Sequence, residues 1–121
     1  MTDSLRIAHC SDIHLDGDHY HHDQYVEASD YYRESFEKVL AEMRGHNPDI
    51  MLLAGDLFDA NSATKETIEW SMQVIADQPC PMAMIPGNHD CLIEGGLYQR
   101  HDFKAIPNLT FITAEHGETL W

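Results

Sequence analysis

Short apolar runs alternate with amphipathic stretches along the chain. Residues 5–10, 50–54, 82–85 and 109–113 are apolar runs of strand length, and the second is continuous enough for a strand buried on both faces. Between them, apolar residues at helical spacing predict helices over residues 30–44 and 64–76, and a shorter helical piece over residues 97–105. This order predicts an α/β fold with a mainly parallel sheet, helices on its faces and right-handed crossovers.

Local signals mark the ends of the two long helices. Ser29 or Asp30 is expected to cap the first helix, and Gly45 suits the position just past its end. Residues 61–64 are expected to cap the second helix, which runs to about Ala76. The inner faces of both helices are predicted to belong to the core, through Tyr32, Phe36, Val39, Leu40 and Met43 in the first and Ile68, Met72 and Ile75 in the second.

Composition is typical of a soluble globular protein of one domain. The chain has 121 residues, of which 43% are hydrophobic, and no apolar run reaches membrane-spanning length. The first residues lack the basic and apolar regions of a signal peptide. The three cysteines, Cys10, Cys80 and Cys91, have no metal-binding spacing and indicate reduced thiols. We therefore expect a cytoplasmic location and no contact with a membrane.

The charge is strongly acidic, and this constrains the partners. A net charge of −14 with only seven Lys and Arg residues argues against a surface that binds a polyphosphate backbone by itself. The acidity is explained either by solubility or by carboxylates gathered to hold divalent cations. The polar stretch at residues 16–28 contains His19, His21, His22 and Asp23, for which a solvated loop is favoured over a local metal site.

Polar motifs directly follow three of the predicted strands. They are Asp12-x-His14, Gly55-Asp56-x-x-Asp59 and Gly87-Asn88-His89-Asp90. Each motif alone is a common turn sequence, but three in this order, each after an apolar strand, are hard to obtain by accident. Because the carboxyl ends of neighbouring parallel strands lie side by side, these polar side chains are expected to meet at one edge of the sheet.

The residue types in these motifs suit a centre with two metal ions. Asp12 and His14 are expected to hold one ion, Asp56 to bridge two ions about 3.5–4 Å apart, and Asn88 to bind the second. Mixed imidazole and oxygen ligands favour Mn, Fe or Zn over Mg or Ca. His89 is expected to contact a phosphate oxygen or to protonate the leaving oxygen.

The role of Asp90 is left open by the sequence. Its carboxylate could orient the ring of His89, or it could serve as a turn or helix-cap residue. Gly55 and Gly87 are expected to let the backbone approach the metals closely, because neither has a side chain in the way.

The three motifs resemble the signature of the calcineurin-like metallophosphoesterases. Residues 11–15, 54–59 and 85–90 look most like the SbcD-type DNA repair nucleases and their bacterial relatives, and the resemblance extends from Leu5 to about Leu120. It implies a four-layer α/β/β/α fold and a dinuclear metal centre. It also implies that Asp12, His14, Asp56 and Asn88 are metal ligands, and that His89 is the catalytic histidine.

One part of the family pattern is missing. The pattern continues with a further His and a Gly-His-x-His motif, neither of which occurs here, and His101 and His116 do not replace them. We therefore expect residues 1–121 to form the N-terminal part of a metallophosphoesterase domain, with half of the sandwich unbuilt and three histidine ligands absent.

Three interpretations of function follow. The first is an SbcD-like DNA exonuclease or endonuclease that requires two divalent ions, Mn above all, and works with an SbcC-like ATPase partner. The second is the same chemistry on a small nucleotide or phosphomonoester, which the acidic charge favours. The third is a truncated, inactive domain that binds metal weakly or serves in assembly. An exposed apolar sheet face would in addition favour a homo-oligomer.

Overall fold

The computed structural model describes residues 3–17 and 28–118. Four strands and their connecting helices alternate along this part of the chain, as the sequence predicts. The elements are β1 (Ile7–Cys10), α1 (Ala28–Gly45), β2 (Ile50–Ala54), α2 (Lys65–Ala76), β3 (Met82–Ile85), α3 (Leu97–Arg100), a 3-10 helix η1 (Phe103–Ala105) and β4 (Leu109–Phe111). The predicted α/β fold with a parallel sheet is confirmed.

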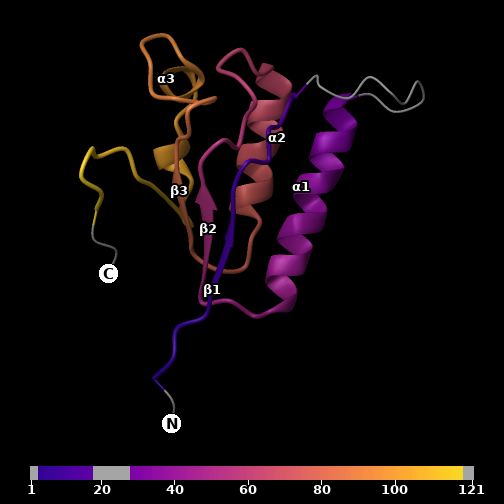
Figure 1. Cartoon of the computed structure of the whole chain (residues 1–121), viewed down its shortest axis with the longest axis vertical. Coiled ribbons are helices and arrows are strands. Elements are labelled where there is room, and N and C mark those ends of the chain that lie inside the picture. Colours follow the sequence, from indigo (N-terminus) through magenta and orange to yellow (C-terminus); the bar gives the residue numbers. More distant parts are fainter. Residues whose placement is uncertain (1–2, 18–27, 119–121) are drawn as a thin grey trace.

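The strands form one parallel sheet in the order β1-β2-β3-β4. Cys10 pairs with Leu53 and Ala54 with Ile85, so the last residues of the first three strands lie nearly level. In Figure 1 these carboxyl ends point upward, toward α3. The segments that follow β1, β2 and β3 therefore start side by side at one edge of the sheet.

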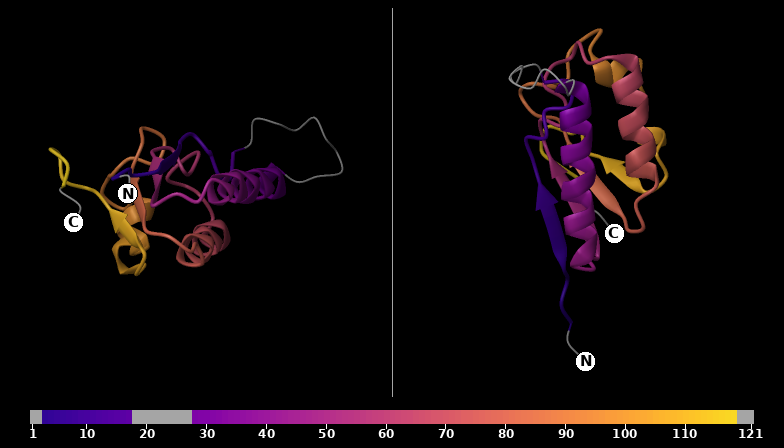
Figure 2. Two further views of the ribbon diagram at one scale, coloured as in Figure 1. Left: turned by 90° about the horizontal axis from the view of Figure 1, so that it is seen from below. Right: turned by 90° about the vertical axis from the view of Figure 1, so that its right-hand side faces the viewer.

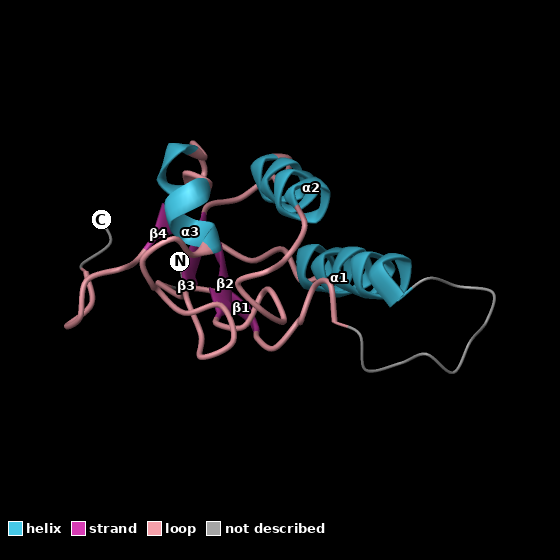
Figure 3. Cartoon of the chain, turned by 90° about the horizontal axis from the view of Figure 1, so that it is seen from above, coloured by secondary structure: helices cyan, strands magenta, loops and turns pink. Residues whose placement is uncertain are grey.

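Both long helices cover the same face of the sheet, as one half of the four-layer α/β/β/α arrangement implied by the resemblance would have them. Each strand is followed by its neighbour in space, so every crossover steps in the same direction across the sheet. Right-handed crossovers that all step one way place their helices on one side. Figures 2 and 3 show α1 and α2 next to each other on that side of the strands.

The core lies between this face and the helices. Met51 and Leu53 of β2 and Met84 of β3 are buried against Phe36 of α1 and Ile68 of α2. Full burial of each such side chain stabilises the fold by about 1.5–3 kcal/mol. The predicted inner faces are confirmed, although two of their members, Val39 and Met72, are only partly buried at the margin of the core.

The opposite face of the sheet is open and apolar. Ile7 is 51% exposed and Ile85 43% exposed, while Leu52 and Ala54 are half-buried. The expectation that residues 50–54 are buried on both faces is therefore wrong for the described residues, because only alternate side chains of β2 face the helices. Exposed apolar faces are common sites of association between proteins.

Element boundaries differ from the predicted ones by a few residues. Helix α1 begins at Ala28, so Ser29 and Asp30 lie within its first turn rather than capping it. Thr64 caps α2 as predicted, since its side chain accepts a hydrogen bond from the N–H of Thr67. Strand β4 ends at Phe111, two residues earlier than expected.

One predicted feature falls outside the described residues, namely the polar stretch with His19, His21, His22 and Asp23. Within the described part, no helix has the length and apolar character needed to cross a bilayer.

Candidate metal centre

The segments that leave β1 and β2 run alongside each other beyond the sheet. The N–H of Asp12 donates to the carbonyl of Gly55 at 3.0 Å, and the N–H of His14 donates to the carbonyl of Asp56, also at 3.0 Å. These two bonds continue the pairing of β1 with β2 through the motifs. They fix Asp12 and His14 relative to Asp56, although the three residues lie far apart in the sequence.

Three of the predicted site residues have a left-handed backbone. The φ angles are +60° at Asp12, +57° at His14 and +54° at Asp56. Asp and His tolerate this region better than most residues, but such conformations still cost about 1–3 kcal/mol each and cluster at functional sites. The backbone bonds between the two segments hold this strained geometry in place.

The loop after β3 lies directly against Asp56. A Cβ added to Gly87 would overlap both the backbone N and the carboxylate of Asp56, so only glycine fits there. The N–H of His89 donates to Oδ1 of Asp56 at 2.9 Å. Asn88 is exposed and lies between these two contacts in the chain. The loop is thus docked on Asp56, with Asn88 at its solvent side.

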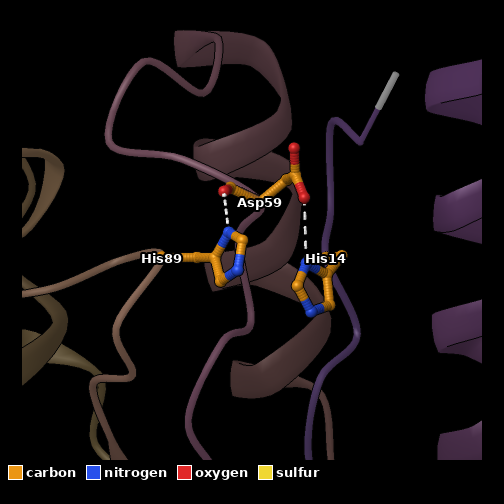
Figure 4. Close-up of side chains that lie close together, drawn as sticks. All are labelled: His14, Asp59 and His89. Carbon is orange, nitrogen blue, oxygen red and sulfur yellow. Dashed lines mark hydrogen bonds and ion pairs between the residues drawn. The ribbon is translucent and has the colours of Figure 1, made fainter. Parts of the chain in front are cut away.

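Asp59 accepts hydrogen bonds from both histidines of the site (Figure 4). Its carboxylate Oδ1 lies 2.9 Å from Nδ1 of His14, and its backbone carbonyl lies 2.9 Å from Nδ1 of His89. The two imidazole rings pack edge to face with centroids 4.7 Å apart. The sequence places Asp59 in a motif without indicating this role, because nothing in the spacing reveals a contact across 45 residues.

These contacts define which ring nitrogens are available. A carbonyl and an ionised carboxylate only accept hydrogen bonds, so Nδ1 carries the hydrogen in both His14 and His89. The lone pair of neutral His14 is then on Nε2, which lies 3.6 Å from Oδ1 of Asp12 and 4.0 Å from Oδ2 of Asp56. An imidazole oriented through a carboxylate on its other nitrogen is the usual arrangement of a metal-binding histidine.

The charges around His14 and Asp12 change their proton affinities. Burial by itself lowers the pKa of His14, but the hydrogen bond with Asp59 and the charges of Asp59 and Asp56 outweigh it and raise the pKa. The hydrogen bond from Ser11 lowers the pKa of Asp12, with Oγ of Ser11 at 2.7 Å from Oδ2. Asp12 is thus held ionised, as a metal ligand must be.

The donor set fits a divalent cation. One ligand atom from each of Asp12, His14 and Asp56 lies within 4.8 Å of the others, close enough to converge on one ion after small adjustments. The structure therefore brings these three predicted residues together, and Asn88 belongs to a loop that contacts Asp56. Their roles as ligands, and that of His89 in catalysis, stay predictions.

Asp90 has a structural role. It is fully buried, and its carboxylate accepts hydrogen bonds from the N–H of Gly87 at 2.7 Å, the N–H of Phe58 at 3.2 Å and the hydroxyl of Tyr98 at 2.6 Å. Burial and the charge of Asp90 raise the pKa of Tyr98 well above its usual range, so its hydroxyl stays a donor. Of the two roles left open, the turn role agrees with these contacts, since the ring of His89 is held by Asp59 instead.

Comparison with known proteins agrees with this geometry. The sequence profile of the calcineurin-like phosphoesterases matches residues 5–118, which include all three motifs. The chain belongs to the calcineurin-like phosphoesterase family. The predicted resemblance is confirmed, and with it, at the level of the family, the prediction of a hydrolase that acts on phosphoesters. Members of this family typically bind divalent metals, in agreement with the donor set.

Individual relatives are similar over most of the chain. A probable cyclic nucleotide phosphodiesterase from Pseudoalteromonas sp. is 32% identical over 105 residues, covering 79% of this chain and 37% of the relative. The DNA double-strand break repair protein Mre11 of Methanosarcina acetivorans is 31% identical over 93 residues, covering 74% and 15%. The SbcD component of the nuclease SbcCD from Staphylococcus epidermidis is 32% identical over 90 residues, covering 71% and 23%. The matched part thus spans well under half the length of these relatives.

Proposed function

We propose that the chain forms the N-terminal part of a metal-dependent phosphodiesterase. The observation that carries the proposal is the convergence of Asp12, His14 and Asp56, with ligand atoms within 4.8 Å of one another, at the edge where three parallel strands end. Two divalent ions held there would supply Lewis-acid activation of the phosphoryl group and of water.

The proposed ligands divide between two ions. Asp12 and Nε2 of His14 would hold the first, Asp56 would bridge, and the side-chain oxygen of Asn88 would bind the second. Mixed nitrogen and oxygen donors support Mn, with Fe or Zn as alternatives. The three further histidines implied by the family pattern would complete both ions from residues other than those of this chain.

His89 is proposed as the general acid. Its Nδ1–H donates to the carbonyl of Asp59, which leaves Nε2 to exchange a proton with a substrate oxygen. The contact with Asp59 also fixes the ring plane, because rotation about the side chain would break it. We propose that the imidazole acts beside the metal centre as a proton donor and not as one of its ligands.

Two substrate classes remain candidates, each favoured by a different observation. The names of two relatives, Mre11 and the SbcD component of nuclease SbcCD, and the Leu57-Phe58-Asp59 sequence favour an SbcD-like DNA exonuclease or endonuclease, with an SbcC-like ATPase as its partner. The net charge of −14 and the name of the Pseudoalteromonas relative favour a small nucleotide. We also propose a cytoplasmic location, and a homo-oligomer formed through the open sheet face.

The experiment compares the whole protein with its His89→Ala variant. Each is loaded with Mn²⁺, its metal content is determined, and hydrolysis of single-stranded DNA and of cyclic AMP is assayed. We expect the variant to keep two ions per chain and to lose about 10²–10⁴-fold in kcat, the usual contribution of general acid catalysis. Loss of both ions from the variant would make His89 a ligand. Failure of the wild type to bind metal or to hydrolyse either substrate would overturn the proposed function.

A further inference from the structure

One carboxylate ties the segment after β1 (residues 11–17) to helix α2. Asp16 lies two residues after His14, and its Oδ2 accepts hydrogen bonds from the N–H of Thr64 at 2.8 Å and from the hydroxyl of Thr64 at 3.0 Å. Its Oδ1 accepts a hydrogen bond from the hydroxyl of Thr67 at 2.7 Å. Both oxygens of Asp16 therefore face donors at the start of α2, which lie 48 and 51 residues further along the chain.

Thr67 extends this contact to α1. It is fully buried, and its hydroxyl oxygen accepts a hydrogen bond from Nη2 of Arg33 at 2.7 Å. Because a guanidinium only donates, the hydroxyl hydrogen of Thr67 is directed at the carboxylate of Asp16 instead. Arg33 lies over the ring of Trp70, with its guanidinium carbon 5.5 Å from the ring centroid. The donor to Asp16 is thus itself held in place by side chains of both long helices.

Asp16 is also the third residue of this segment with a left-handed backbone. Its φ angle is +62°, after +60° at Asp12 and +57° at His14. In residues other than glycine, such angles persist only where the surrounding structure determines them. The backbone bonds with the segment after β2 do this for Asp12 and His14, and the bonds of the carboxylate to α2 do it for Asp16.

Leu15 connects Asp16 to the metal centre. The N–H of Leu15 donates to the carbonyl of Leu57 at 2.8 Å, and its carbonyl accepts the N–H of Asp59 at 2.9 Å. The carboxylate of Asp59 in turn lies 2.9 Å from Nδ1 of His14 (Figure 4). Because Leu15 precedes Asp16 and follows His14, a change of backbone at Asp16 reaches both partners of that bond.

We infer that Asp16 is a positioning residue of the metal centre, which keeps His14 and Asp59 in the arrangement that leaves Nε2 of His14 for the metal. This inference rests on the proposed function and deepens it. Asp16 binds no metal itself, since its oxygens are directed at donors of α2. It acts through these hydrogen bonds and not through its charge, so an amide at this position preserves most of its effect.

The test compares three variants of the whole protein with the wild type. Asp16→Ala removes all three hydrogen bonds to α2. Asp16→Asn removes the charge, but it keeps an oxygen that accepts from Thr64 and gains an amide group that donates to the hydroxyl oxygen of Thr67. Asp102→Ala is the matched control, because the carboxylate of Asp102 also accepts a backbone N–H at the start of a helix, that of Lys104 at 3.1 Å. That helix, η1, lies beside β4, at the opposite edge of the sheet from β1.

The first measurement is amide hydrogen exchange of the metal-free protein, followed by NMR. It compares hydrogen-bonded N–H groups of two regions, the first of which is the segment and its partner strand extension, represented by His14, Leu15 and Asp59. The second is the centre of the sheet, represented by Met51 and Met82. Exchange of individual amides separates a local opening of the segment from a loss of stability of the whole fold.

We expect Asp16→Ala to accelerate exchange in the segment about tenfold more than in the sheet, the upper end of the net value of a single hydrogen bond. Asp16→Asn should stay close to the wild type. Asp102→Ala should leave the ratio between the two regions unchanged, because its hydrogen bond lies outside both.

The second measurement is calorimetric titration with Mn²⁺ under conditions in which every variant is folded. Asp16→Ala should bind Mn²⁺ about tenfold more weakly than the wild type, the lower end of the effect of groups that orient a metal ligand. Asp16→Asn should recover most of this loss, and Asp102→Ala should bind Mn²⁺ like the wild type.

Failure of the inference is distinguishable from failure of the proposed function. The inference would be overturned by wild-type Mn²⁺ affinity in Asp16→Ala, or by equal acceleration of exchange in segment and sheet, since Asp16 would then only stabilise the fold. Equal losses of Mn²⁺ affinity in Asp16→Ala and Asp16→Asn would overturn it too, because they would assign the effect to charge. Wild-type protein that binds no Mn²⁺ would overturn the proposed function, while the exchange rates would still decide whether Asp16 holds His14 and Asp59 in place.

Discussion

Two carboxylates are buried at the same edge of the sheet, and their surroundings differ. Asp90 is fully buried and accepts three hydrogen bonds, from Gly87, Phe58 and Tyr98. Asp56 is 6% exposed, and its Oδ1 accepts one backbone hydrogen bond while its Oδ2 faces His14 at 4.0 Å. The first carboxylate is saturated by donors of the protein, and the second keeps lone pairs directed at the site.

This difference separates a structural from a functional carboxylate. A buried charge is tolerated only where it is hydrogen-bonded or meets an opposite charge. Asp90 meets that requirement through the protein alone, so it fixes the Gly87–Asp90 loop without further ligands. Asp56 meets it in part, and a divalent cation beside Asp12 and His14 would supply the rest. Substitution of Asp56 should therefore act mainly on metal binding, and substitution of Asp90 mainly on stability.

The largest effect is expected from Asp56→Asn in the whole protein. An amide is a poor bridge between two cations, so metal content should fall and kcat should drop by about 10³-fold or more, since metal ions supply several kcal/mol of transition-state stabilisation. Metal analysis and the phosphodiesterase assay measure this. Glu69→Gln on the exposed side of α2 is the control for loss of one negative charge. Retention of two ions by Asp56→Asn would contradict the bridging role.

The second variant, Asp90→Ala, should act on stability. It leaves two backbone N–H groups and the hydroxyl of Tyr98 without their acceptor, and each unsatisfied buried donor costs about 1–3 kcal/mol. We expect the free energy of unfolding of the metal-free protein to fall by about 3 kcal/mol, as measured by urea denaturation. Asp56→Ala, measured in the same way, should cost much less. Equal losses in the two variants would remove the distinction between them.

The third prediction concerns the link between Asp59 and His14. Because nearby carboxylates raise the pKa of His14, its proton competes with the metal, and Mn²⁺ affinity should fall as pH drops below that pKa. In the metal-free protein, the dependence on pH has the opposite direction, because protonation of His14 contributes to folding stability. A raised folded-state pKa stabilises the fold below the unfolded pKa of about 6.5, and this stabilisation is lost as pH rises through the folded value.

Asp59→Asn tests this link, because it keeps an acceptor oxygen and removes the charge. The variant should bind Mn²⁺ about tenfold more weakly at high pH, the lower end of the effect of groups that orient a ligand. Its affinity should also begin to fall at a lower pH than in the wild type. Calorimetric titrations between about pH 5 and 8, the range in which histidine titrates, measure both quantities. An unchanged pH dependence would show that Asp59 does not control the proton on His14.

The part of the fold that could be predicted from the sequence follows from local patterns. Alternation of apolar strands with amphipathic helices was enough to predict the parallel sheet, and the positions of Asp12, Asp56 and Asn88 just after three strands indicated a shared edge. These features depend on residues close together in the chain. Local patterns alone do not give the coverage of one face, since it depends on the direction in which successive crossovers step, and here it was implied by the resemblance to a four-layer family fold.

The missed features of the site are contacts between distant segments. Asp59 reaches His14 across 45 residues and His89 across 30, and Asp90 reaches Phe58 across 32. No periodicity or turn signal reports such contacts. The Gly55-Asp56-x-x-Asp59 motif indicates that Asp59 has some function, because it places a second carboxylate three residues after Asp56. Its specific role required the positions of both imidazole rings.

The smallest effect is expected from Tyr98→Phe. The ring of Tyr98 packs against Phe103 and Phe111, with centroid distances of 5.2 and 4.7 Å, and phenylalanine keeps this packing. Only the hydroxyl bond to Asp90 is lost, and Oδ2 of Asp90 still accepts from the N–H of Phe58. The free energy of unfolding should therefore fall by about 1 kcal/mol, the net value of one hydrogen bond.

This loss should be absent from the Asp90→Ala background, since the hydroxyl of Tyr98 then has no acceptor to lose. The double variant Asp90→Ala/Tyr98→Phe should accordingly be as stable as Asp90→Ala or slightly more stable, because it removes an unsatisfied buried hydroxyl. Urea denaturation of the four proteins gives the coupling energy directly. If the losses in the free energy of unfolding were additive, Tyr98 would stabilise the fold independently of Asp90. The carboxylate of Asp90 would then stabilise the loop only through the N–H groups of Gly87 and Phe58.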